Sequence, residues 1–509
     1  MKNLFLTSLV LLAAVVQLFA QENNSELFRA FQNKSENSIL PDFSYAGYHC
    51  GEKEIPTITN YKIFDVTAFG AIPNDTLSDK VAIQKAIDAA NQNGSGIVFF
   101  PKGRFLVNVK NDSPNPIASR SSNIILRGSG SGVNGTELFM GVTLQPEDPT
   151  KMWTVPYLFQ MKGTGTDKKI GDVSESSSIG SLALTLTATD GLKEKDWISL
   201  KMQSNAPELI REAVTGRLID STWTFLLTKG VVIQVFYQVV SVNRNTILLQ
   251  APISYPVDPK YKWEVYKFAH IEEVGIEDLA FVGNWKSAFV HHRSWQDDSG
   301  YSLLQFIGCT NSWMKNCRFT DCNAGAVTKR CANMTISDCM VDGNPGHNAI
   351  SAHGSTNILL SNLTDNAGMW HSFGVAESSM NTVIRKCKYP KNTCFESHSS
   401  QPRNTLLDEV EGGLLNNRGG GANVNMPNHL TGLVFWNYTQ TNEAFQEFEF
   451  WPVKPWYWRV PNPIIVGFMS KGTTFKNDQL GAYESPGRIA DPASLYQAQL
   501  QLRMNIKKQ

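Results

Sequence analysis

The chain has 509 residues, enough to bury a large hydrophobic core. Lys plus Arg and Asp plus Glu both number 46, so the formal net charge is zero at pH 7. Proteins that bind nucleic acid usually carry an excess of basic residues on one face, and this composition has none. We therefore expect no nucleic-acid partner.

The first twenty residues have the pattern of a secretory signal peptide. Lys2 precedes an apolar run from Leu4 to Phe19, and Ala20 stands before a polar stretch. The run is short for a bilayer about 30 Å thick, so a cleaved signal (residues 1–20) is favoured over a membrane anchor. We expect an exported protein, periplasmic or secreted, with no membrane span after signal cleavage.

A strand, a turn, a helix and a second strand are predicted between Tyr61 and Val107. The helix should run from about Lys80 to Asn91, with Ser78 as N-cap and Gly94 as its stop. Such a helix could cover the open end of a β-structure, whose unpaired edge would otherwise invite aggregation. Residues 21–139 are therefore interpreted as an N-terminal segment and cap.

The next region, residues 140–270, has no regular long period. Its alternating runs, such as SLALTLTATDGL and VIQVFYQVVSV, favour strands with one buried face. We predict a β-rich insertion or irregular coils here.

An internal repeat occupies residues 271–440. Matching apolar positions recur every 22 to 24 residues, and an asparagine stands three positions before each of them: Asn311, Asn333, Asn357, Asn381 and Asn404. This period suits one coil of a parallel β-helix. Asparagine tolerates the left-handed backbone of a sharp bend, and its amide can bond to the next asparagine in the stack.

The repeat also separates inward from outward positions, because side chains alternate along a strand. One outward column reads Ile307, Lys329, His353, Glu377 and Ser400, with His398 beside its end. A column just before the strand reads Tyr301, Asn323, His347, His371 and Cys394. The histidines are therefore expected to share one polar face.

Residues 441–509 are interpreted as an aromatic-rich cap and tail. The run from Phe448 to Arg459 suits either a platform for sugar rings or packing that seals the coil. Several of the eight cysteines repeat with the coil period, which favours buried thiols over disulfides.

Several stretches carry a resemblance to a known superfamily. FDVTAFGAIPND, AIQKAIDAA and GIVFFPKGRFLV, followed by the coils, resemble the pectate-lyase-like right-handed β-helix enzymes. The resemblance implies an all-β fold: a single-stranded right-handed parallel β-helix with an N-terminal capping helix and a β-rich insertion. DFSYAGYHCGE and the coils carrying GHN, WHSFG, FESHSSQPR and MPNHL resemble uronate-directed lyases and dehydratases of marine Bacteroidetes, including those that degrade ulvan.

That resemblance implies β-elimination on an anionic, uronate-containing oligo- or polysaccharide. The reaction needs a group that neutralises the carboxylate, a base for the C5 proton and an acid for the group leaving C4. The candidate catalytic residues are His371, His398, His347 and Lys329. The candidate substrate-binding residues are Arg403, Arg418, Glu396, Trp370, His353, Tyr301 and Tyr48.

Alternatives remain open at this point. Lys329, His353 and Glu377 would also fit a plain surface ladder of paired charges. Asp297 and Asp298 would suit a polygalacturonase-like hydrolase, although their spacing from GHN is two coils rather than one. They would also suit a loop that binds sugar or calcium, the one cofactor considered. A non-catalytic carbohydrate-binding protein is the third alternative.

Overall fold

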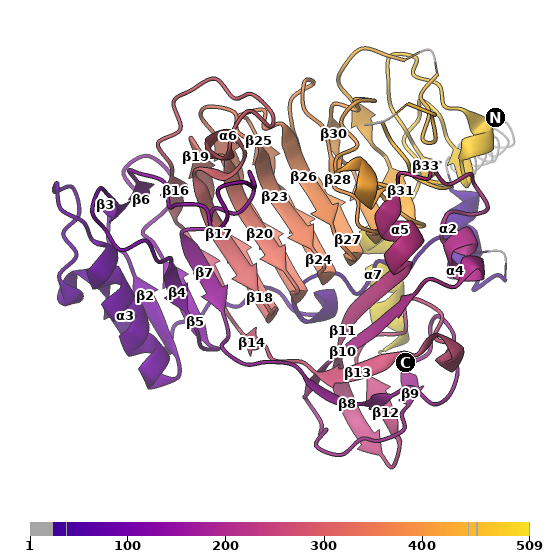
Figure 1. Cartoon of the computed structure of the whole chain (residues 1–509), viewed down its shortest axis with the longest axis horizontal. Helices are drawn as coiled ribbons and strands as arrows, with labels where there is room; N and C mark the ends of the chain where they lie inside the picture. Colours follow the sequence, from indigo (N-terminus) through magenta and orange to yellow (C-terminus); the bar gives the residue numbers. More distant parts are fainter. Residues whose placement is uncertain (1–23, 37, 446, 455–456, 508–509) are drawn as a thin grey trace, which may run out of the picture.

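The computed structural model describes residues 24–36, 38–445, 447–454 and 457–507. The expected signal peptide lies outside these described residues. The chain winds in successive coils along one axis, and the strands of neighbouring coils pair in parallel to form three long sheets (Figure 1). The predicted all-β parallel β-helix is confirmed.

The longest sheet has thirteen strands. In order they are β1 (Ile63–Asp65), β2 (Gly96–Phe99), β5 (Ile124–Arg127), β15 (Gly275–Glu277), β18 (Cys309–Lys315), β21 (Ala332–Ser337), β24 (Thr356–Ser361), β27 (Met380–Arg385), β29 (Arg403–Asp408), β31 (Leu433–Trp436), β33 (Ile464–Val466) and β34 (Ala482–Glu484), and β14 (Ile271–Glu272) also pairs with β18.

Two shorter parallel sheets complete the coils. The seven-stranded sheet contains β4 (Ile117–Ser119), β7 (Phe159–Lys162), β17 (Ser302–Ile307), β20 (Ala324–Lys329), β23 (Asn348–His353), β26 (His371–Ala376) and β28 (Glu396–Ser397). The six-stranded sheet contains β3 (Gly103–Asn108), β6 (Thr136–Met140), β16 (Ala280–Val282), β19 (Arg318–Thr320), β22 (Met340–Asp342) and β25 (Thr364–Asp365). A separate pair joins β30 (Glu411–Gly412) to β32 (Thr439–Gln440).

The asparagine ladder forms as predicted. Asn333, Asn357 and Asn381 have φ angles of 52°, 57° and 64°, which place all three in the left-handed region. Nδ2 of Asn357 donates to Oδ1 of Asn333 at 3.1 Å, and Nδ2 of Asn381 donates to Oδ1 of Asn357 at 2.7 Å. The ladder thus ties consecutive coils together at their bends.

Helix α3 (Lys80–Asn93) covers the end of the coils that lies on the left in Figure 1. Its buried residues, which include Ile83 and Ile87, join the core of the β-helix. Gly94 ends the helix with a φ of 81°, as predicted. The predicted N-cap is off by one residue: Asp79 occupies that position, and its carboxylate accepts from the backbone N–H groups of Ile72 and Leu106.

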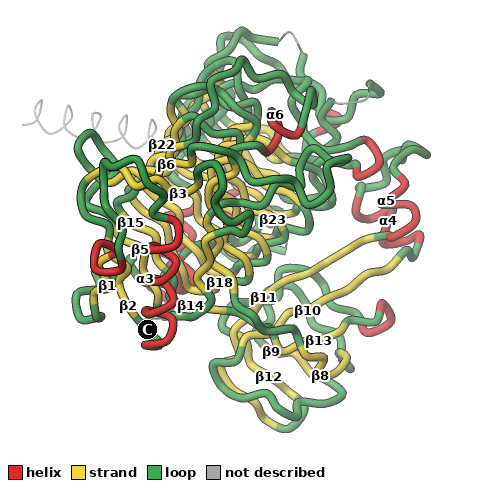
Figure 2. Tube along the Cα trace, turned by 60° about the vertical axis from the view of Figure 1, so that its left-hand side comes forward, coloured by secondary structure: helices red, strands yellow, loops and turns green. Residues whose placement is uncertain are grey.

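An antiparallel six-stranded sheet interrupts the coils. Its order is β8 (Lys168–Asp172), β13 (Glu264–Lys267), β10 (Trp197–Ser204), β11 (Val231–Asn243), β12 (Thr246–Leu249) and β9 (Ala183–Thr185). Figure 2 shows it projecting from the coils, with α4 (Pro207–Ala213) and α5 (Thr224–Lys229) at the far end of β10 and β11. The expected boundary at residue 140 is too early, because β7 pairs with β4 and β17 inside the coil.

The coils also continue beyond residue 440, where a cap had been expected. Strands β33 and β34 extend the longest sheet. Phe448, Phe450 and Trp458 are buried in the main core, so these aromatic side chains serve packing. The remaining helices are α2 (Glu26–Gln32), α6 (Trp295–Ser299), α7 (Leu495–Ile506) and the short 3-10 segments η1 (Tyr48–Gly51), η2 (Val66–Phe69), η3 (Pro259–Tyr261), η4 (Asn423–Asn425) and η5 (Asn477–Gln479).

All eight cysteines are buried free thiols, as predicted. Within the described ranges, no helix combines the length and the apolar character needed to cross a membrane.

Candidate active site

A cluster of histidines lies at the seven-stranded sheet. We call His291, His347, His371, His398 and Glu396 the histidine cluster. The ring centroids of His347 and His371 are 5.4 Å apart, and those of His371 and His398 are 6.2 Å apart. The coil brings them together because β23, β26 and β28 are consecutive neighbours in the sheet.

The register of these strands differs from the predicted columns by one residue. Ile350 pairs with Phe373, so Ala376 rather than Glu377 continues the column of Lys329 and His353. Glu377 instead occupies the following bend with a φ of 56°. The slip also pairs His371 with Asn348 instead of His347.

The predicted charge ladder forms only in part. The Glu377 carboxylate lies 3.5 Å from Nζ of Lys329 despite the slip. His353 places Nε2 2.9 Å from Oγ of Ser351. Cys394 is buried in the core and leaves the predicted polar column.

Glu396 is the buried anion of the cluster. Its Oε1 lies 3.3 Å from Nε2 of His371 and contacts Nδ1 of His398, while its Oε2 accepts from Nδ2 of Asn348 at 3.1 Å. Burial would raise the pKa of Glu396, but its contacts with His371 and His398 outweigh that effect and the pKa falls. Glu396 is therefore a carboxylate that orients two imidazoles.

His398 is the accessible member of this pair. Its side chain is 43% exposed, whereas the Glu396 side chain is 3% exposed. Burial would lower the pKa of His398, but the adjoining carboxylate reverses this and raises it. Because Nδ1 faces Glu396, Nε2 is the nitrogen available to a substrate. An exposed imidazole backed by a buried carboxylate is an arrangement suited to a general base.

His347 and His371 each have one ring nitrogen with a neighbour and one without. Nδ1 of His347 lies 3.1 Å from the carbonyl oxygen of Asp298, and Nε2 of His371 faces Glu396. Nε2 of His347 and Nδ1 of His371 are buried and have no hydrogen-bond partner in the described part of the chain. Burial lowers the pKa of both residues, which favours the neutral imidazole.

His291 and His292 were missed by the sequence reasoning. His291 has ring centroids 5.4 Å from His347 and 5.8 Å from His371, and burial lowers its pKa to about 3. Nδ1 of His292 lies 2.5 Å from Oδ2 of Asp298. The doubled histidine in HHRSW, just before α6, was the available signal, but it lies in a loop outside the repeat.

Trp370 and Arg418 lie beside the cluster, as the sequence suggested. The rings of Trp370 and His291 stack with centroids 4.6 Å apart and an interplanar angle of 14°. The Arg418 guanidinium lies over Trp370 at 3.2 Å, and its Nη1 donates to the Trp370 carbonyl at 2.8 Å. Nε of Arg418 is buried and unpaired among the described residues, and burial lowers the pKa of this side chain. The Arg418 guanidinium therefore places a positive charge beside the cluster.

Two predicted binding residues, Arg403 and Tyr48, have other roles. Arg403 is buried beneath the insertion, where Nη1 donates to the carbonyls of Val232 and Gln401 at 3.1 and 2.9 Å. Burial lowers its pKa to about 10. Its bonds to β11 fasten the insertion to the coils, so the prediction of substrate binding is wrong.

Tyr48 is also committed elsewhere, whereas substrate binding by Tyr301 stays a prediction. Tyr48 is buried over the thirteen-stranded sheet, where it packs on Trp313 and its hydroxyl donates to Oε2 of Glu273 at 2.7 Å. Tyr301 is partly buried against the main core, and burial raises its pKa. Tyr48 therefore lies away from the histidine cluster, because η1 contacts β18, β21 and β24 of the thirteen-stranded sheet.

Asp297 and Asp298 are internal anchors of the loop around α6. Their residues are 1% and 3% exposed. Oδ1 of Asp297 accepts from Nη2 of Arg293 at 2.7 Å, while Asp298 pairs with His292. Neither carboxylate is available as half of a hydrolytic pair.

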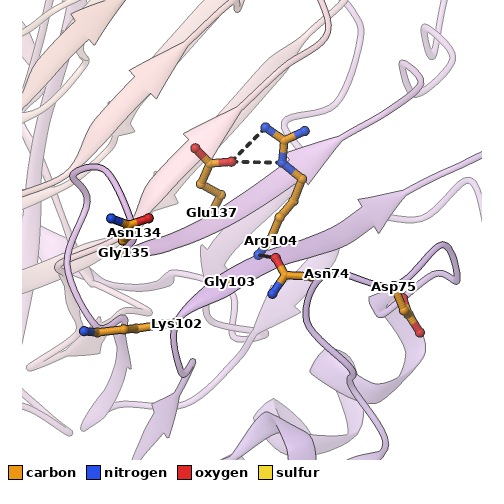
Figure 3. A pocket seen from close by; sticks show the side chains of 8 residues that line it. All are labelled: Asn74, Asp75, Lys102, Gly103, Arg104, Asn134, Gly135 and Glu137. Carbon is orange, nitrogen blue, oxygen red and sulfur yellow. Dashed lines mark hydrogen bonds and ion pairs between the residues drawn. The ribbon is translucent and has the colours of Figure 1, made fainter.

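A second surface feature lies near α3 and carries no histidine. Figure 3 shows this pocket, in which Arg104 pairs with Glu137 and Asn74 accepts from the Arg104 backbone N–H at 3.0 Å. Its remaining lining residues are Asp75, Lys102, Gly103, Asn134 and Gly135. The paired charges leave no acid and base poised for catalysis, so the histidine cluster is the stronger candidate.

Three family descriptions match parts of the chain, and two of these parts overlap. Residues 286–423 match "Right handed beta helix region", and residues 63–136 match "Rhamnogalacturonase A/epimerase, pectate lyase-like". Residues 368–508 match "Domain of unknown function (DUF4955)". The first match covers the whole histidine cluster and agrees with the right-handed coil.

Among curated proteins, mannuronan C5-epimerase AlgE6 of Azotobacter vinelandii is 35% identical over 78 residues, which is 15% of this chain and 9% of that protein. AlgE3 of the same organism is 34% identical over 80 residues, or 4% of its length. The chain thus spans less than a tenth of the curated relatives that it matches.

Similar solved structures include the tailspike protein gp49 from Pseudomonas phage LKA1, at 15% identity and a TM-score of 0.44, with 79% of this chain and 64% of that chain covered. The A-module of AlgE6 has 13% identity and a TM-score of 0.40, with 84% and 95% covered.

Proposed function

We propose that this chain is an exported β-eliminase that acts on uronic-acid-containing poly- or oligosaccharides, ulvan-like ones included. The observation that carries the proposal is the pairing of the exposed His398 with the buried Glu396 carboxylate. The carboxylate holds Nδ1 and stabilises the imidazolium that forms when Nε2 takes a proton.

The reaction follows from these positions. Nε2 of His398 takes the proton from C5 of the uronate, and the C–H electron pair forms the C4–C5 double bond. The C4–O bond breaks, and its electron pair stays on the leaving oxygen, which accepts a proton. Lys329 and His353, on neighbouring strands of the same face, carry the N–H groups suited to donate that proton.

The uronate carboxylate must be neutralised for the C5 proton to become acidic. Arg418, held over the Trp370 ring, supplies a cation beside the histidine cluster. The name of the AlgE6 relative, a mannuronan C5-epimerase, describes chemistry at the same carbon of a uronate. That agreement supports a uronate substrate.

The leaving group separates two forms of the reaction. A lyase would release a sugar chain, whereas a dehydratase would release water from a terminal uronate. The test is incubation of tag-free protein with uronate-containing algal and plant saccharides while ultraviolet absorbance, reducing ends and product mass are followed together.

Both forms raise absorbance, because the product is a conjugated uronate. Lyase action also creates reducing ends, and dehydration makes the product lighter by one water. Reducing ends without absorbance would instead identify hydrolysis. His270→Ala serves as a histidine control, since His270 packs on Phe268 and Trp197 outside the cluster.

A further inference from the structure

Three imidazoles of the histidine cluster converge on one point. His291, His347 and His371 each offer a ring nitrogen, and these three atoms lie within 4.8 Å of one another. Nitrogen ligands of a tetrahedral Zn²⁺ stand about 3.3 Å apart, given bonds of about 2.0–2.1 Å. Modest side-chain rotations would close that difference. We propose that these three histidines form a binding site for a divalent transition metal, with Zn²⁺ as its best-matched ion.

The second nitrogen of two of these rings supports the assignment. A histidine that binds a metal usually shares its other ring N–H with a carboxylate or a backbone carbonyl, which fixes the tautomer. Nδ1 of His347 has the Asp298 carbonyl at 3.1 Å, and Nε2 of His371 has the Glu396 carboxylate at 3.3 Å. The nitrogens left over, Nε2 of His347 and Nδ1 of His371, are those buried without a partner in the described chain.

These unpaired nitrogens need an explanation, because a buried polar atom without a partner costs free energy. His371 itself is only 3% exposed, so its Nδ1 is well removed from bulk solvent. A metal ion would satisfy both lone pairs at once. His291, held flat against Trp370, would then supply the third bond.

The ligand types decide which ion fits. Imidazole suits zinc, copper, nickel and iron, whereas calcium needs several oxygen ligands. The nearby carboxylates of Asp297 and Asp298 are engaged by Arg293 and His292.

His371, Glu396 and His398 form a second group with ligand atoms within 4.8 Å, but Glu396 already contacts both of those histidines. We therefore place Glu396 as the outer partner of a three-histidine site.

Three protein ligands leave a fourth position open, as in catalytic zinc sites. In the proposed elimination, an ion there would neutralise the uronate carboxylate beside His398. This role rests on the proposed function, whereas the metal site itself does not.

The test is metal binding by the full chain without a polyhistidine tag. Protein stripped with a chelator is dialysed against Zn²⁺, and bound metal is counted by elemental analysis. One Zn²⁺ per chain is expected, with affinity lowered about 100-fold or more by His291→Ala or His347→Ala and about 10- to 100-fold by Glu396→Gln. His270→Ala should bind as the wild type does. Absence of binding by the wild type, or unchanged affinity in both ligand variants, would overturn the proposal.

Co²⁺ added to the stripped wild type gives a readout that needs no variant. Intense visible absorption, typical of four-coordinate Co²⁺, is expected, and a weak octahedral spectrum would contradict the site. The two proposals fail separately: metal bound without elimination leaves the site standing, and elimination by a wild type that binds no metal leaves only the function standing.

Discussion

Nε2 of His371 lies 3.3 Å from Oε1 of Glu396, across two adjacent strands of the β-helix. The same carboxylate contacts His398, so one buried anion holds two imidazoles of different exposure. An anion removed from water is costly unless cations or hydrogen bonds surround it. Folding alone therefore gives little reason to bury the Glu396 carboxylate, which points to a role for it in the site.

His398→Ala should lower the turnover number by about 100-fold or more, because general-base catalysis contributes about 10²–10⁴ to the rate. Its melting temperature should change little, since the side chain is 43% exposed and water can take its place beside Glu396. Initial rates of absorbance increase and thermal melting check both expectations, with His270→Ala as the matched control. A variant that retains the full rate would exclude His398 as the base.

Arg418→Ala should raise KM by about 10- to 100-fold, which corresponds to loss of a charged hydrogen bond worth about 1.5–3 kcal/mol. The physical reason is the Arg418 guanidinium beside Trp370, whose positive charge we assign to the uronate carboxylate. Arg211→Ala, at an exposed position in α4, is the control for loss of one positive charge. Equal KM values for the two variants would speak against this role.

Asn357→Ala should destabilise the fold through two effects. Alanine in the left-handed region costs about 1–2 kcal/mol, and the lost ladder bonds leave buried partners unpaired at about 1–3 kcal/mol. Asn357→Gly keeps the left-handed φ of 57° at no steric cost, so it should lose only the second contribution. Denaturant midpoints followed by circular dichroism should rank wild type above glycine and glycine above alanine; identical midpoints would refute the ladder's role.

Asp408 gives a prediction on pH and stability. Its carboxylate is buried and accepts from Oγ of Ser494 at 2.5 Å and from the Leu495 N–H at 3.0 Å, at the start of α7. Burial raises its pKa from 3.8 to about 7, so the folded state holds the proton more tightly than the unfolded state. The stability from protonation is therefore present below about pH 4 and is lost as pH rises to about 7.

Asp408→Asn removes this dependence. The free energy of unfolding of the wild type, relative to the variant, should fall between about pH 4 and about pH 7. Urea titrations of both proteins across that range provide the measurement. Parallel curves would show that Asp408 keeps an ordinary pKa.

Much of the fold was predictable because the sequence repeat marks the position of each bend. A left-handed asparagine every 22 to 24 residues fixes where each coil turns, and the ladder of Asn333, Asn357 and Asn381 follows from it. The local register was not predictable. An extra residue lies between Ala376 and Met380 compared with the coil before, and a uniform alignment cannot tell on which side of the strand it falls.

The site residues on the repeating coils were predictable, whereas those on loops outside the repeat were not. His371, His398 and Glu396 were found because neighbouring coils stack. His291 was missed because it lies in a loop outside the 22- to 24-residue repeat. Arg403 was misplaced because the insertion that covers it packs through contacts far apart in sequence, such as that with Val232.

The most direct test of the elimination is a uronate oligosaccharide labelled with deuterium at C5. Product mass after reaction in ordinary water shows whether the C5–H bond was broken. We predict that the unsaturated product has lost the deuterium and that the labelled substrate reacts more slowly than the unlabelled one. His398→Ala should slow product formation and label loss together by about 100-fold or more. Products that retain deuterium at C5 would show cleavage without proton abstraction and contradict the proposed function.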